Sequence, residues 1–422
     1  WLKPYGIRPS FGGLPLLGQS RHRSAPSSLS MILTEVYPEN QLIWADAVPC
    51  EKSSAGYRPK SDLGAPFDSS DALRICFLNE DRLRCARYEI LHYNIKDYHD
   101  DGPPALDQIV EACRLIEDGL QAKRQVVVYV PEGAQFKGHR SFSALCVAAH
   151  RVLARREGAA QAIAPWQTGG PAGSSVAFFV NSWASKKMTA PKRSLTLELC
   201  VRTIEVARDR GWIDLASFDS SKYLDLWRQY DLSWIVPGEL QVLGDPVSTV
   251  EDPDPATVGT IEPQEGKDKP SFVSYFLENS VKLIIRLNLM SEPGLKKSYE
   301  PAVFTKHSIS CLDASYDDIN GGVPSKQILK KILAKCGEFA SENQKAAVAF
   351  HCKAGFGRSV VCAATWLIYH HDLPGEVAYT WSRLCRPGSI TTPQQAQFLQ
   401  GLQGKSGVEE DVLKPEGCCT VQ

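Results

Sequence analysis

The chain has 422 residues, of which 43% are hydrophobic and 23% are charged. This composition excludes a disordered or collagen-like chain, and the length suggests two or three domains of about 150 residues each. Lys and Arg together number 47 and Asp and Glu 48, so the formal net charge of -1 supplies no global field for binding nucleic acid or anionic lipid.

Residues 1–40 are rich in Gly, Pro and Ser and predict an irregular lead-in. From residue 41, apolar runs such as 42–44, 75–78 and 126–130 alternate with helical patterns such as 105–120. This alternation is typical of an α/β fold and predicts a first domain over 41–192. Its last part, 158–192, is polar and rich in Gly and Ala, and we expect a loop there.

An amphipathic pattern over 195–210 predicts a helix within a linker region that spans 193–230. A second α/β domain is expected over 231–403, with strands at 281–287 and 346–350. The remaining residues, 404–422, form a short polar tail.

The two α/β segments share a weak internal repeat. The run 126–130 leads into a loop with two glycines and then into a helix from Ser141, and the run 346–350 leads into a loop with two glycines and then into a helix from Ser359. The match is one of shape, so a duplicated domain and a coincidence between two βα units both remain open.

Thirteen cysteines are spread along the chain without a C-x-x-C pair, which favours a reducing compartment over a zinc site or a disulfide framework. Apolar stretches such as 126–130 and 281–285 are much shorter than the roughly 20 residues of a membrane-spanning helix. The sequence therefore predicts neither a metal site nor a transmembrane segment.

Most of the chemistry is concentrated in residues 351–359, which read His-Cys-Lys-Ala-Gly-Phe-Gly-Arg-Ser between an apolar strand and a helix. A loop that closes onto a helix N-terminus turns its N–H groups inward and binds an anion such as phosphate. The same positive groups favour the nucleophilic thiolate of Cys352, and Arg358 can hold two phosphoryl oxygens at once. The alternative for Cys352 is a buried structural cysteine.

The other residues of this loop have supporting roles. We expect the phosphate to contact the segment from the residue after the nucleophile to the arginine: Lys353, Ala354, Gly355, Phe356, Gly357 and Arg358. Gly355 and Gly357 are expected to adopt backbone angles that a side chain would forbid. Ser359 could donate a hydrogen bond to the sulfur of Cys352, and His351 is expected to orient the loop.

Several further motifs occur in a fixed order: Asp101-Gly102-Pro103, Trp234-Ile235-Val236-Pro237-Gly238, Arg286-Leu287-Asn288, the Cys352 loop, Cys385-Arg386-Pro387-Gly388-Ser389-Ile390 and Pro393-Gln394-Gln395. With them the chain resembles the cell-division-cycle-fourteen dual-specificity phosphatases of the protein tyrosine phosphatase superfamily, over about residues 90–403. The resemblance implies two tandem dual-specificity-phosphatase-like α/β domains joined by a linker helix, of which only the second is active. It favours duplication as the origin of the repeat.

The resemblance also implies a general acid, and Asp313 after the run 308–312 matches the family position. The loop that follows is longer than in the family, so Asp317 and Asp318 are the alternatives. Gln394 and Gln395 match the segment that positions the hydrolytic water. The family works without a cofactor or metal.

The family's activity implies that the partners are phosphorylated proteins in which the phosphoserine is followed by proline. It also implies a cell-cycle or cytoskeletal role in the nucleus or cytoplasm. We expect no nucleic-acid partner, and the sequence does not reveal the oligomeric state. Two alternatives remain: a phosphoinositide phosphatase, which shares the His-Cys-Lys-Ala-Gly segment, and a catalytically silent scaffold that binds phosphopeptides.

The last four residues, Cys419-Thr420-Val421-Gln422, fit a prenylation box, and a terminal Gln favours farnesyl. Cys418 could carry a palmitoyl group as the second anchor. Membrane association is expected only through this lipidation, and the alternative is a terminal cysteine that occurs by chance.

Overall fold

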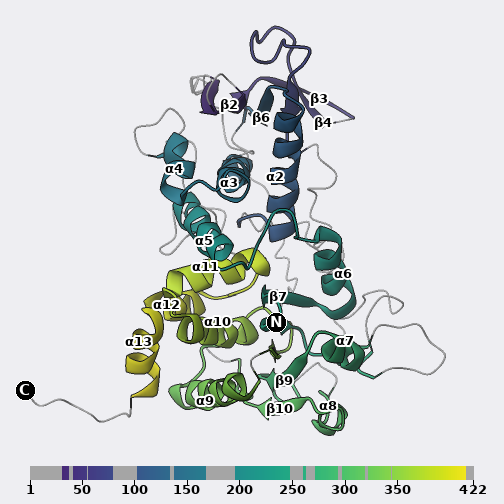
Figure 1. The fold of residues 1–422 in the computed structure, drawn as a ribbon, viewed down its shortest axis with the longest axis vertical. Helices are drawn as coiled ribbons and strands as arrows, with labels where there is room; N and C mark the ends of the chain where they lie inside the picture. Colours follow the sequence, from purple (N-terminus) through teal and green to yellow (C-terminus); the bar gives the residue numbers. More distant parts are fainter. Residues whose placement is uncertain are drawn as a thin grey trace, which may run out of the picture. The chain divides into compact units, whose positions relative to one another are not determined.

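The computed structural model describes residues 31–37, 41–54, 56–78, 102–133, 137–167, 195–247, 260–262, 271–292, 297–318, 322–343 and 345–414. In chain order the first half contains β1 (Ile32–Tyr37), β2 (Leu42–Val48), β3 (Cys50–Ser53), β4 (Gly56–Pro59), β5 (Leu73–Ile75), α2 (Leu106–Gln121), β6 (Val126–Pro131), α3 (Lys137–Leu153), α4 (Ala159–Ile163), α5 (Leu197–Asp209) and α6 (Ser220–Tyr230). The elements are labelled in Figure 1.

The second half contains β7 (Leu232–Val236), β8 (Leu240–Leu243), α7 (Phe272–Glu278), β9 (Val281–Arg286), α8 (Ala302–Thr305), β10 (Ser310–Asp313), α9 (Lys326–Glu342), β11 (Ala347–His351), α10 (Arg358–His371), α11 (Gly375–Cys385), α12 (Pro393–Gly401) and α13 (Gly404–Val408). Both halves contain a sheet with parallel strand pairs together with helices, so the predicted α/β class is confirmed. Among the described residues, no helix is both long enough and apolar enough to cross a bilayer.

The four strands of the first main sheet have the same order as four strands of the second, which has β10 as an additional edge strand. The strand order across the first sheet is β1-β2-β6-β5, and the order across the second sheet is β7-β8-β11-β9-β10. In each sheet the first pair is antiparallel and the pairs that follow are parallel. The repeat seen in the sequence is therefore a repeat of topology. The first half also contains a separate two-stranded sheet of β3 and β4, which has no counterpart among the described residues of the second half.

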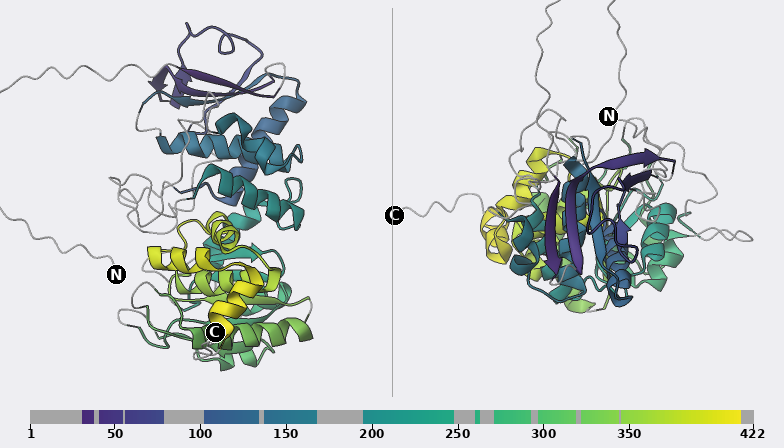
Figure 2. Two further views of the ribbon diagram at one scale, coloured as in Figure 1. Left: turned by 90° about the vertical axis from the view of Figure 1, so that its left-hand side faces the viewer. Right: turned by 90° about the horizontal axis from the view of Figure 1, so that it is seen from above.

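Each sheet is buried on both faces, which explains why its central strands are continuous apolar runs. On β11, Val348 and Phe350 face the core cluster formed with α9, α10 and α11, whereas Ala347 and Ala349 face the cluster that includes α7. On the first sheet, helices α2 and α3 cover one face, and the right-hand view of Figure 2 shows its purple strands side by side.

Helices α5 and α6 occupy the predicted linker region. Thr196 caps α5 by accepting a hydrogen bond from the N–H of Leu199, and Asp219 caps α6 in the same way. Helix α5 contacts α11, and the nearby rings of Trp212 and Trp381 lie 5.9 Å apart. Helix α5 also contacts α3 and α4, and α6 contacts α2, so the linker is a pair of helices that packs against both halves.

Three segments differ from what the sequence led us to expect. The predicted irregular lead-in ends in strand β1, whose alternating burial was hidden by its polar residues. The predicted loop over 158–192 begins with α4 and a 3-10 turn at Ala164–Trp166, which bury Ala162 and Trp166. The polar tail begins with α13 and a helical turn at Glu409–Leu413, because Val408 and Val412 pack into the core.

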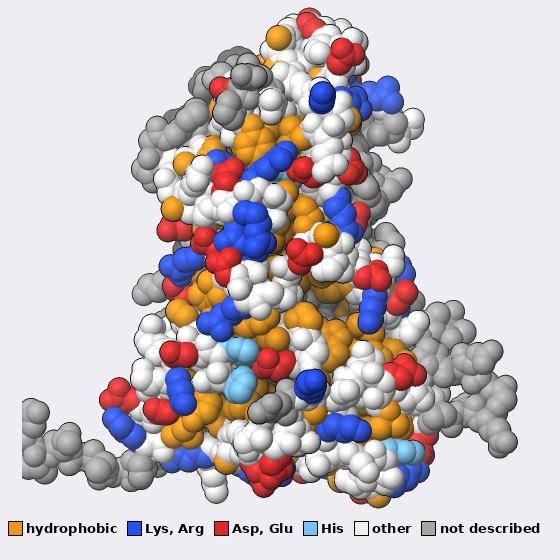
Figure 3. Space-filling model, in the orientation of Figure 1, with side chains coloured by type: hydrophobic (Ala, Val, Ile, Leu, Met, Phe, Trp, Pro, Cys, Tyr) orange, Lys and Arg blue, Asp and Glu red, His pale blue; other side chains and the backbone are white. Residues whose placement is uncertain are grey.

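Charge on the surface is mixed. On the face shown in Figure 3, acidic and basic side chains are interspersed, in keeping with the formal net charge of -1. Recognition of a charged ligand on this face would therefore depend on local groups.

Candidate active site

The loop that follows β11 lies at the carboxyl end of the central parallel strands. Strand β11 runs between β8 and β9 and ends at His351, and α10 begins at Arg358. The carboxyl edge of a parallel sheet is where α/β proteins place their ligand sites. The predicted strand–loop–helix context of Cys352 is confirmed.

Arg386 holds two carbonyl groups of this loop. Its Nε donates to the carbonyl of Gly355 at 2.6 Å and its Nη2 donates to that of Ala354 at 3.2 Å. The guanidinium is fully buried and lies over the rings of Trp227 and Phe356, 4.4 and 4.6 Å from their centroids. A charge buried this deeply must be paired, and Asp231 supplies a carboxylate oxygen at 2.8 Å.

Two more loop carbonyls also point away from the centre of the loop. The carbonyl of Lys353 accepts from the N–H of Asp245 at 3.1 Å, and that of Phe356 accepts from the N–H of Ile390 at 2.7 Å. In a trans peptide the C=O of one residue and the N–H of the next point in opposite directions. Four outward carbonyls at 353–356 therefore leave the N–H groups that follow them directed inward, toward a common anion site.

The two loop glycines have different roles. Gly355 has a φ of +70°, and a Cβ there would lie 2.6 Å from the carbonyl of Leu243, so only glycine fits. Gly357 has φ -100° and ψ -92°, so its φ is negative and its ψ lies beyond the right-handed helical range. What limits Gly357 is space, because a Cβ would lie 3.0 Å from Nε2 of Gln395.

Cys352 lies at the base of the loop with 4% of its surface exposed. Its Sγ is 3.4 Å from the hydroxyl of Ser359, which is fully buried in the first turn of α10. A hydroxyl at this position can donate to a thiolate and stabilise it. The structure thus brings the predicted nucleophile and its predicted supporting serine together.

His351 is fully buried, and its Nε2 lies 2.6 Å from the hydroxyl of Tyr299. Burial lowers the pKa of His351 to about 4, although the charge of Asp245 acts in the opposite direction. The imidazole is therefore neutral at neutral pH and serves to fix the start of the loop.

Arg358 is held by a carboxylate that the sequence analysis did not identify. Its Nη1 and Nη2 lie 2.7 and 3.2 Å from the two carboxylate oxygens of Glu292, and Nη1 also donates to the carbonyl of Tyr316 at 2.9 Å. Burial lowers the pKa of the Arg358 guanidinium, but Glu292, together with the charges of Cys352 and Asp318, outweighs this effect and the net shift is upward. Nε of Arg358 is buried without a hydrogen-bond partner.

Asp313 ends β10, and its carboxylate is paired with the guanidinium of Arg286 and accepts the N–H of Ser315 at 3.1 Å. Burial raises the pKa of Asp313, but the hydrogen bonds from Arg286 and Ser315 outweigh it, so the net pKa lies below its ordinary value. Almost half of its side chain, 46%, is exposed. In this arrangement Asp313 is a carboxylate bound to arginine.

The two alternative acids lie farther along the same segment. Asp317 and Asp318 are both exposed, and an oxygen of Asp318 lies 3.8 Å from Nε of Arg358. Asp318 also lies near Gly322, where a Cβ would come within 2.5 Å of its carboxylate and 3.0 Å of Nε2 of Gln395. Of the three candidate acids, Asp318 is therefore the one that the described contacts bring to the arginine of the loop.

The two glutamines of the predicted water-positioning segment differ in burial. Gln394 is exposed at the start of α12, whereas Gln395 is 1% exposed and its Oε1 accepts the N–H of Thr391 at 2.8 Å. Its Nε2 faces Gly357, at the end of the loop. The structure thus places Gln395, and not Gln394, against the loop.

Other predicted residues lie outside the described parts of the chain. They are Asp101 of the first motif and the two candidate lipidation sites Cys418 and Cys419.

Three side chains that build the site were missed as site residues: Glu292, Asp245 and Arg386. Asp245 accepts hydrogen bonds from Asn288 at 2.7 Å and Ser298 at 2.6 Å, and its own N–H holds the loop. The Arg386 motif was noted only as a family marker. One signal in the sequence could have identified the two acidic residues. A buried arginine needs a carboxylate partner, and Asp245 and Glu292 follow the strands β8 and β9.

No protein-family model matches the chain. Among curated proteins, the tyrosine-protein phosphatase cdc-14 of Caenorhabditis elegans is 28% identical over 344 residues, which are 79% of this chain and 43% of that protein. The dual specificity protein phosphatase CDC14A of Mus musculus is 32% identical over 225 residues, 52% of this chain and 33% of that protein.

The dual specificity protein phosphatase CDC14B of Mus musculus is 25% identical over 406 residues, which are 89% of this chain and 76% of that protein. The chain spans less than half the length of the first two of these relatives. The match to the third covers more than two thirds of both chains. The chain is thus similar in sequence, over half to nine tenths of its length, to phosphatases of the Cdc14 type.

Proposed function

We propose that the chain is a cysteine-dependent protein phosphatase that hydrolyses phosphoserine, phosphothreonine and phosphotyrosine through a phosphocysteine intermediate. The observation that carries this proposal is the set of four outward carbonyls at 353–356, because it leaves inward N–H groups at the base of which Cys352 lies. The names of the curated relatives, which are protein phosphatases, support the same chemistry.

In the first step Sγ of Cys352 attacks phosphorus, so that an S–P bond forms while the P–O bond to the substrate breaks. The loop N–H groups and Arg358 hold the equatorial oxygens, on which charge is spread in the transition state. Nε of Arg358, which makes no hydrogen bond, is the donor that remains for one of these oxygens. Glu292 fixes the orientation of this guanidinium.

A general acid gives its proton to the departing oxygen of Ser, Thr or Tyr. In the second step the same group takes a proton from water, whose oxygen attacks phosphorus and releases the thiolate of Cys352. Gln395, buried against the loop, is suited to hold this water. Ser359, close to Sγ, stabilises the thiolate as it leaves.

We retain Asp313 as the acid that the family resemblance proposes, and the contacts of Asp318 favour it as the second candidate. To act as an acid, Asp313 must be protonated, and its pairing with Arg286 opposes protonation. A change in the 313–318 segment that releases Asp313 from Arg286 would remove this obstacle. Asp318 already lies beside Arg358 and needs no such release.

Leaving groups of different basicity distinguish these two acids. A serine alkoxide needs a proton far more than a nitrophenolate does, so loss of the acid lowers turnover of a phosphoserine peptide much more than that of p-nitrophenyl phosphate. We expect Asp313→Asn to show this selective loss. The same pattern in Asp318→Asn, with an unchanged profile in Asp313→Asn, would transfer the role to Asp318.

The substrates we propose are phosphorylated proteins with proline after the phosphoserine, in a cell-cycle or cytoskeletal role within the nucleus or cytoplasm. If Cys419 is prenylated, and Cys418 palmitoylated, the enzyme would attach to a membrane through this tail. Both features come from the family resemblance and from the sequence of the last residues.

The proposal is tested by multiple-turnover phosphate release, in chelator, from matched phosphoserine-proline, phosphotyrosine and phosphoinositide substrates. We expect turnover that prefers the phosphoserine-proline peptide and is abolished in Cys352→Ser, while Cys50→Ser, a half-buried thiol of the first half, keeps full activity. Tight peptide binding without turnover would instead indicate a scaffold, and preference for the lipid would indicate a phosphoinositide phosphatase.

A further inference from the structure

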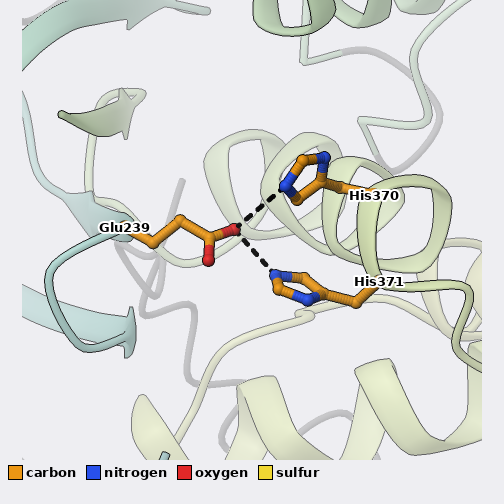
Figure 4. A group of neighbouring side chains, drawn as sticks. All are labelled: Glu239, His370 and His371. Carbon is orange, nitrogen blue, oxygen red and sulfur yellow. Dashed lines mark hydrogen bonds and ion pairs between the residues drawn. The ribbon is translucent and has the colours of Figure 1, made fainter. Parts of the chain in front are cut away.

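Two histidines and one glutamate converge on a second site. Glu239 lies in the turn between β7 and β8, and His370 and His371 form the last turn of α10. Oε1 of Glu239 is 2.7 Å from Nε2 of His371 and 3.8 Å from Nε2 of His370, and Figure 4 shows both rings directed at this one oxygen. The three ligand atoms all lie within 4.8 Å of one another.

The fold keeps this cluster away from the Cys352 loop. Glu239 precedes β8, and its carbonyl accepts the N–H of Val348 at 2.8 Å, so it lies at the amino edge of the parallel strands. The Cys352 loop lies at the carboxyl edge. Helix α10 joins the two edges, and its 14 residues span about 20 Å at 1.5 Å per residue.

Aromatic rings restrain both histidines. The ring of His371 meets that of Trp212 edge to face at 5.1 Å, and the ring of His370 stacks on that of Trp366 at 4.6 Å with an interplanar angle of 21°. The side chains of His370 and Glu239 are 38% and 34% exposed, so the cluster is open to solvent on one side. Histidine side chains reach the surface of the face shown in Figure 3, next to acidic ones.

We propose that Glu239, His370 and His371 bind a zinc ion through one carboxylate oxygen and two Nε2 atoms, with water as the fourth ligand. Two histidines and a glutamate are a known three-ligand set for zinc with an open fourth position. Bonds of about 2.0–2.1 Å in tetrahedral geometry place donor atoms about 3.3 Å apart, and the observed 2.7 and 3.8 Å lie on either side of that value.

The competing interpretation is a hydrogen-bonded cap on the carboxyl end of α10, where a basic residue is favourable. One histidine bonded to Glu239 would satisfy that role, but it leaves the second Nε2 directed at the same oxygen unexplained. The positive charge of Lys405 acts on His370 and would also repel a metal ion bound there. The carboxylate of Glu239 opposes this repulsion.

The proposed zinc would fasten the end of α10 to the turn between β7 and β8. Because it lies about one helix length from Cys352, we expect it to stabilise the fold without taking part in phosphate hydrolysis. The inference therefore goes beyond the proposed function and does not depend on it.

Metal binding is measured on the full chain without a histidine tag, after chelator treatment, with zinc by calorimetry and with cobalt by absorption. We expect one equivalent of metal, a melting temperature raised by zinc, and a cobalt spectrum without the near-ultraviolet band of a thiolate ligand. The thiolate band is needed as a criterion because Cys352 can itself bind zinc. Cys352→Ser should therefore keep the same single equivalent.

Two conservative variants test the ligands. His370→Phe keeps the stacking on Trp366, and Glu239→Gln keeps an acceptor for His371, so both should fold with the melting temperature of the metal-free parent. Each is expected to raise the zinc Kd by more than about tenfold, the least that loss of even an outer partner usually costs. His307→Ala is the matched control, because His307 lies 3.8 Å from Glu262 and the described residues supply no second histidine there.

Absence of binding at one equivalent, or a thiolate band that disappears in Cys352→Ser together with the bound metal, would overturn the proposal. So would unchanged zinc affinity in both His370→Phe and Glu239→Gln. The readouts do not include phosphate release, so failure of the phosphatase proposal would leave this test intact.

Discussion

The two strand–loop–helix units, β6 to α3 and β11 to α10, share their place in the sheet but differ in their side chains. The strand of each unit is followed directly by Glu132 in the first and by Cys352 in the second. Each helix begins near a buried arginine: Arg140 in the first unit and Arg358 in the second.

The arginines are paired differently. Nε of Arg140 lies 2.6 Å from a carboxylate oxygen of Asp46. Arg358 instead uses its two terminal nitrogens for Glu292, and its Nε makes no hydrogen bond and lies 3.8 Å from a carboxylate oxygen of Asp318. An acidic residue after the strand, such as Glu132, repels phosphate. Because Arg140 pairs through Nε, the edge of its guanidinium that contains Nε is already engaged by a carboxylate. The two units therefore share their fold and differ in the few side chains on which the proposed phosphate binding depends.

The largest expected contrast comes from the same substitution in the two units. Arg358→Lys replaces a planar fork by a point charge, and we expect kcat/KM for a phosphopeptide to fall on the order of 10³-fold. Arg140→Lys is the matched control and should lower the melting temperature while leaving kcat/KM unchanged. Steady-state kinetics with both variants check this, and an equal loss in Arg140→Lys would mean that the first unit takes part in catalysis.

The second contrast comes from two glycines, one in each half, whose φ angles are nearly equal. Gly355 has φ +70° and Gly64, in the first half, has φ +72°, but a Cβ at Gly64 would meet nothing within 4 Å. Gly64→Ala should cost only the left-handed conformation, about 1–2 kcal/mol of unfolding free energy. Gly355→Ala must also displace Leu243 or Arg386, and we expect kcat/KM to fall about 100-fold through misplacement of the loop.

Denaturant unfolding and phosphate release on the same samples separate these two effects. If Gly355→Ala lost no more activity than Gly64→Ala, the loop would not need its present geometry.

Each half also buries a neutral histidine, which predicts a shared pH dependence. Burial lowers the pKa of His150 to about 4 against the pull of Glu117, and lowers that of His351 to about 4. In the unfolded state each histidine has its ordinary pKa of 6.5, so the unfolded chain takes up protons first as the pH falls. This part of the stability is complete above pH 6.5 and is lost progressively toward pH 4.

We expect each histidine to contribute a slope of about 1.4 kcal/mol per pH unit within that window. His150→Gln and His351→Asn should each remove a similar part of the slope in urea unfolding at several pH values. Parent and variant curves that run parallel across the window would contradict the assignment.

The smallest effect is expected where the halves meet at the surface. Arg202 of α5 pairs with Glu376 of α11, and both side chains are 45% exposed. A double-mutant cycle with Arg202→Ala and Glu376→Ala should give a coupling below about 1 kcal/mol that decreases with salt. The exposed pair Asp225 and Arg228 within α6 is the control, and a much larger coupling for the first pair would mean that it fixes the two halves together.

Local patterns allowed the sequence to predict much of this structure. Apolar runs buried on both faces predicted β6, β9 and β11, and the motif at 351–359 predicted the loop because its residues are contiguous. Strand β1 was missed because it is an edge strand with an exposed Glu35, and its alternation extends over only six residues. The end of α13 was missed because Val408 is buried by contacts made in the folded chain.

The supporting side chains could not be predicted for a physical reason. Arg358 and Glu292 are 66 residues apart, and Arg386 and Asp231 are 155 residues apart, so only the completed sheet brings each pair together. The resemblance offered Asp313 as the acid without indicating that Arg286 binds it. Long-range pairing of charges is thus the part of the site that required the structure.

The anchoring of the loop carbonyls has a consequence for the thermodynamics of ligand binding. Arg386 and the N–H groups of Asp245 and Ile390, all of them groups of the protein itself, hold the carbonyls of residues 353–356. The conformational entropy of the loop is therefore lost during folding, not when an oxyanion arrives. We expect an inert phosphate mimic such as vanadate or tungstate to bind as to a rigid receptor, quickly and with little reorganisation of the backbone.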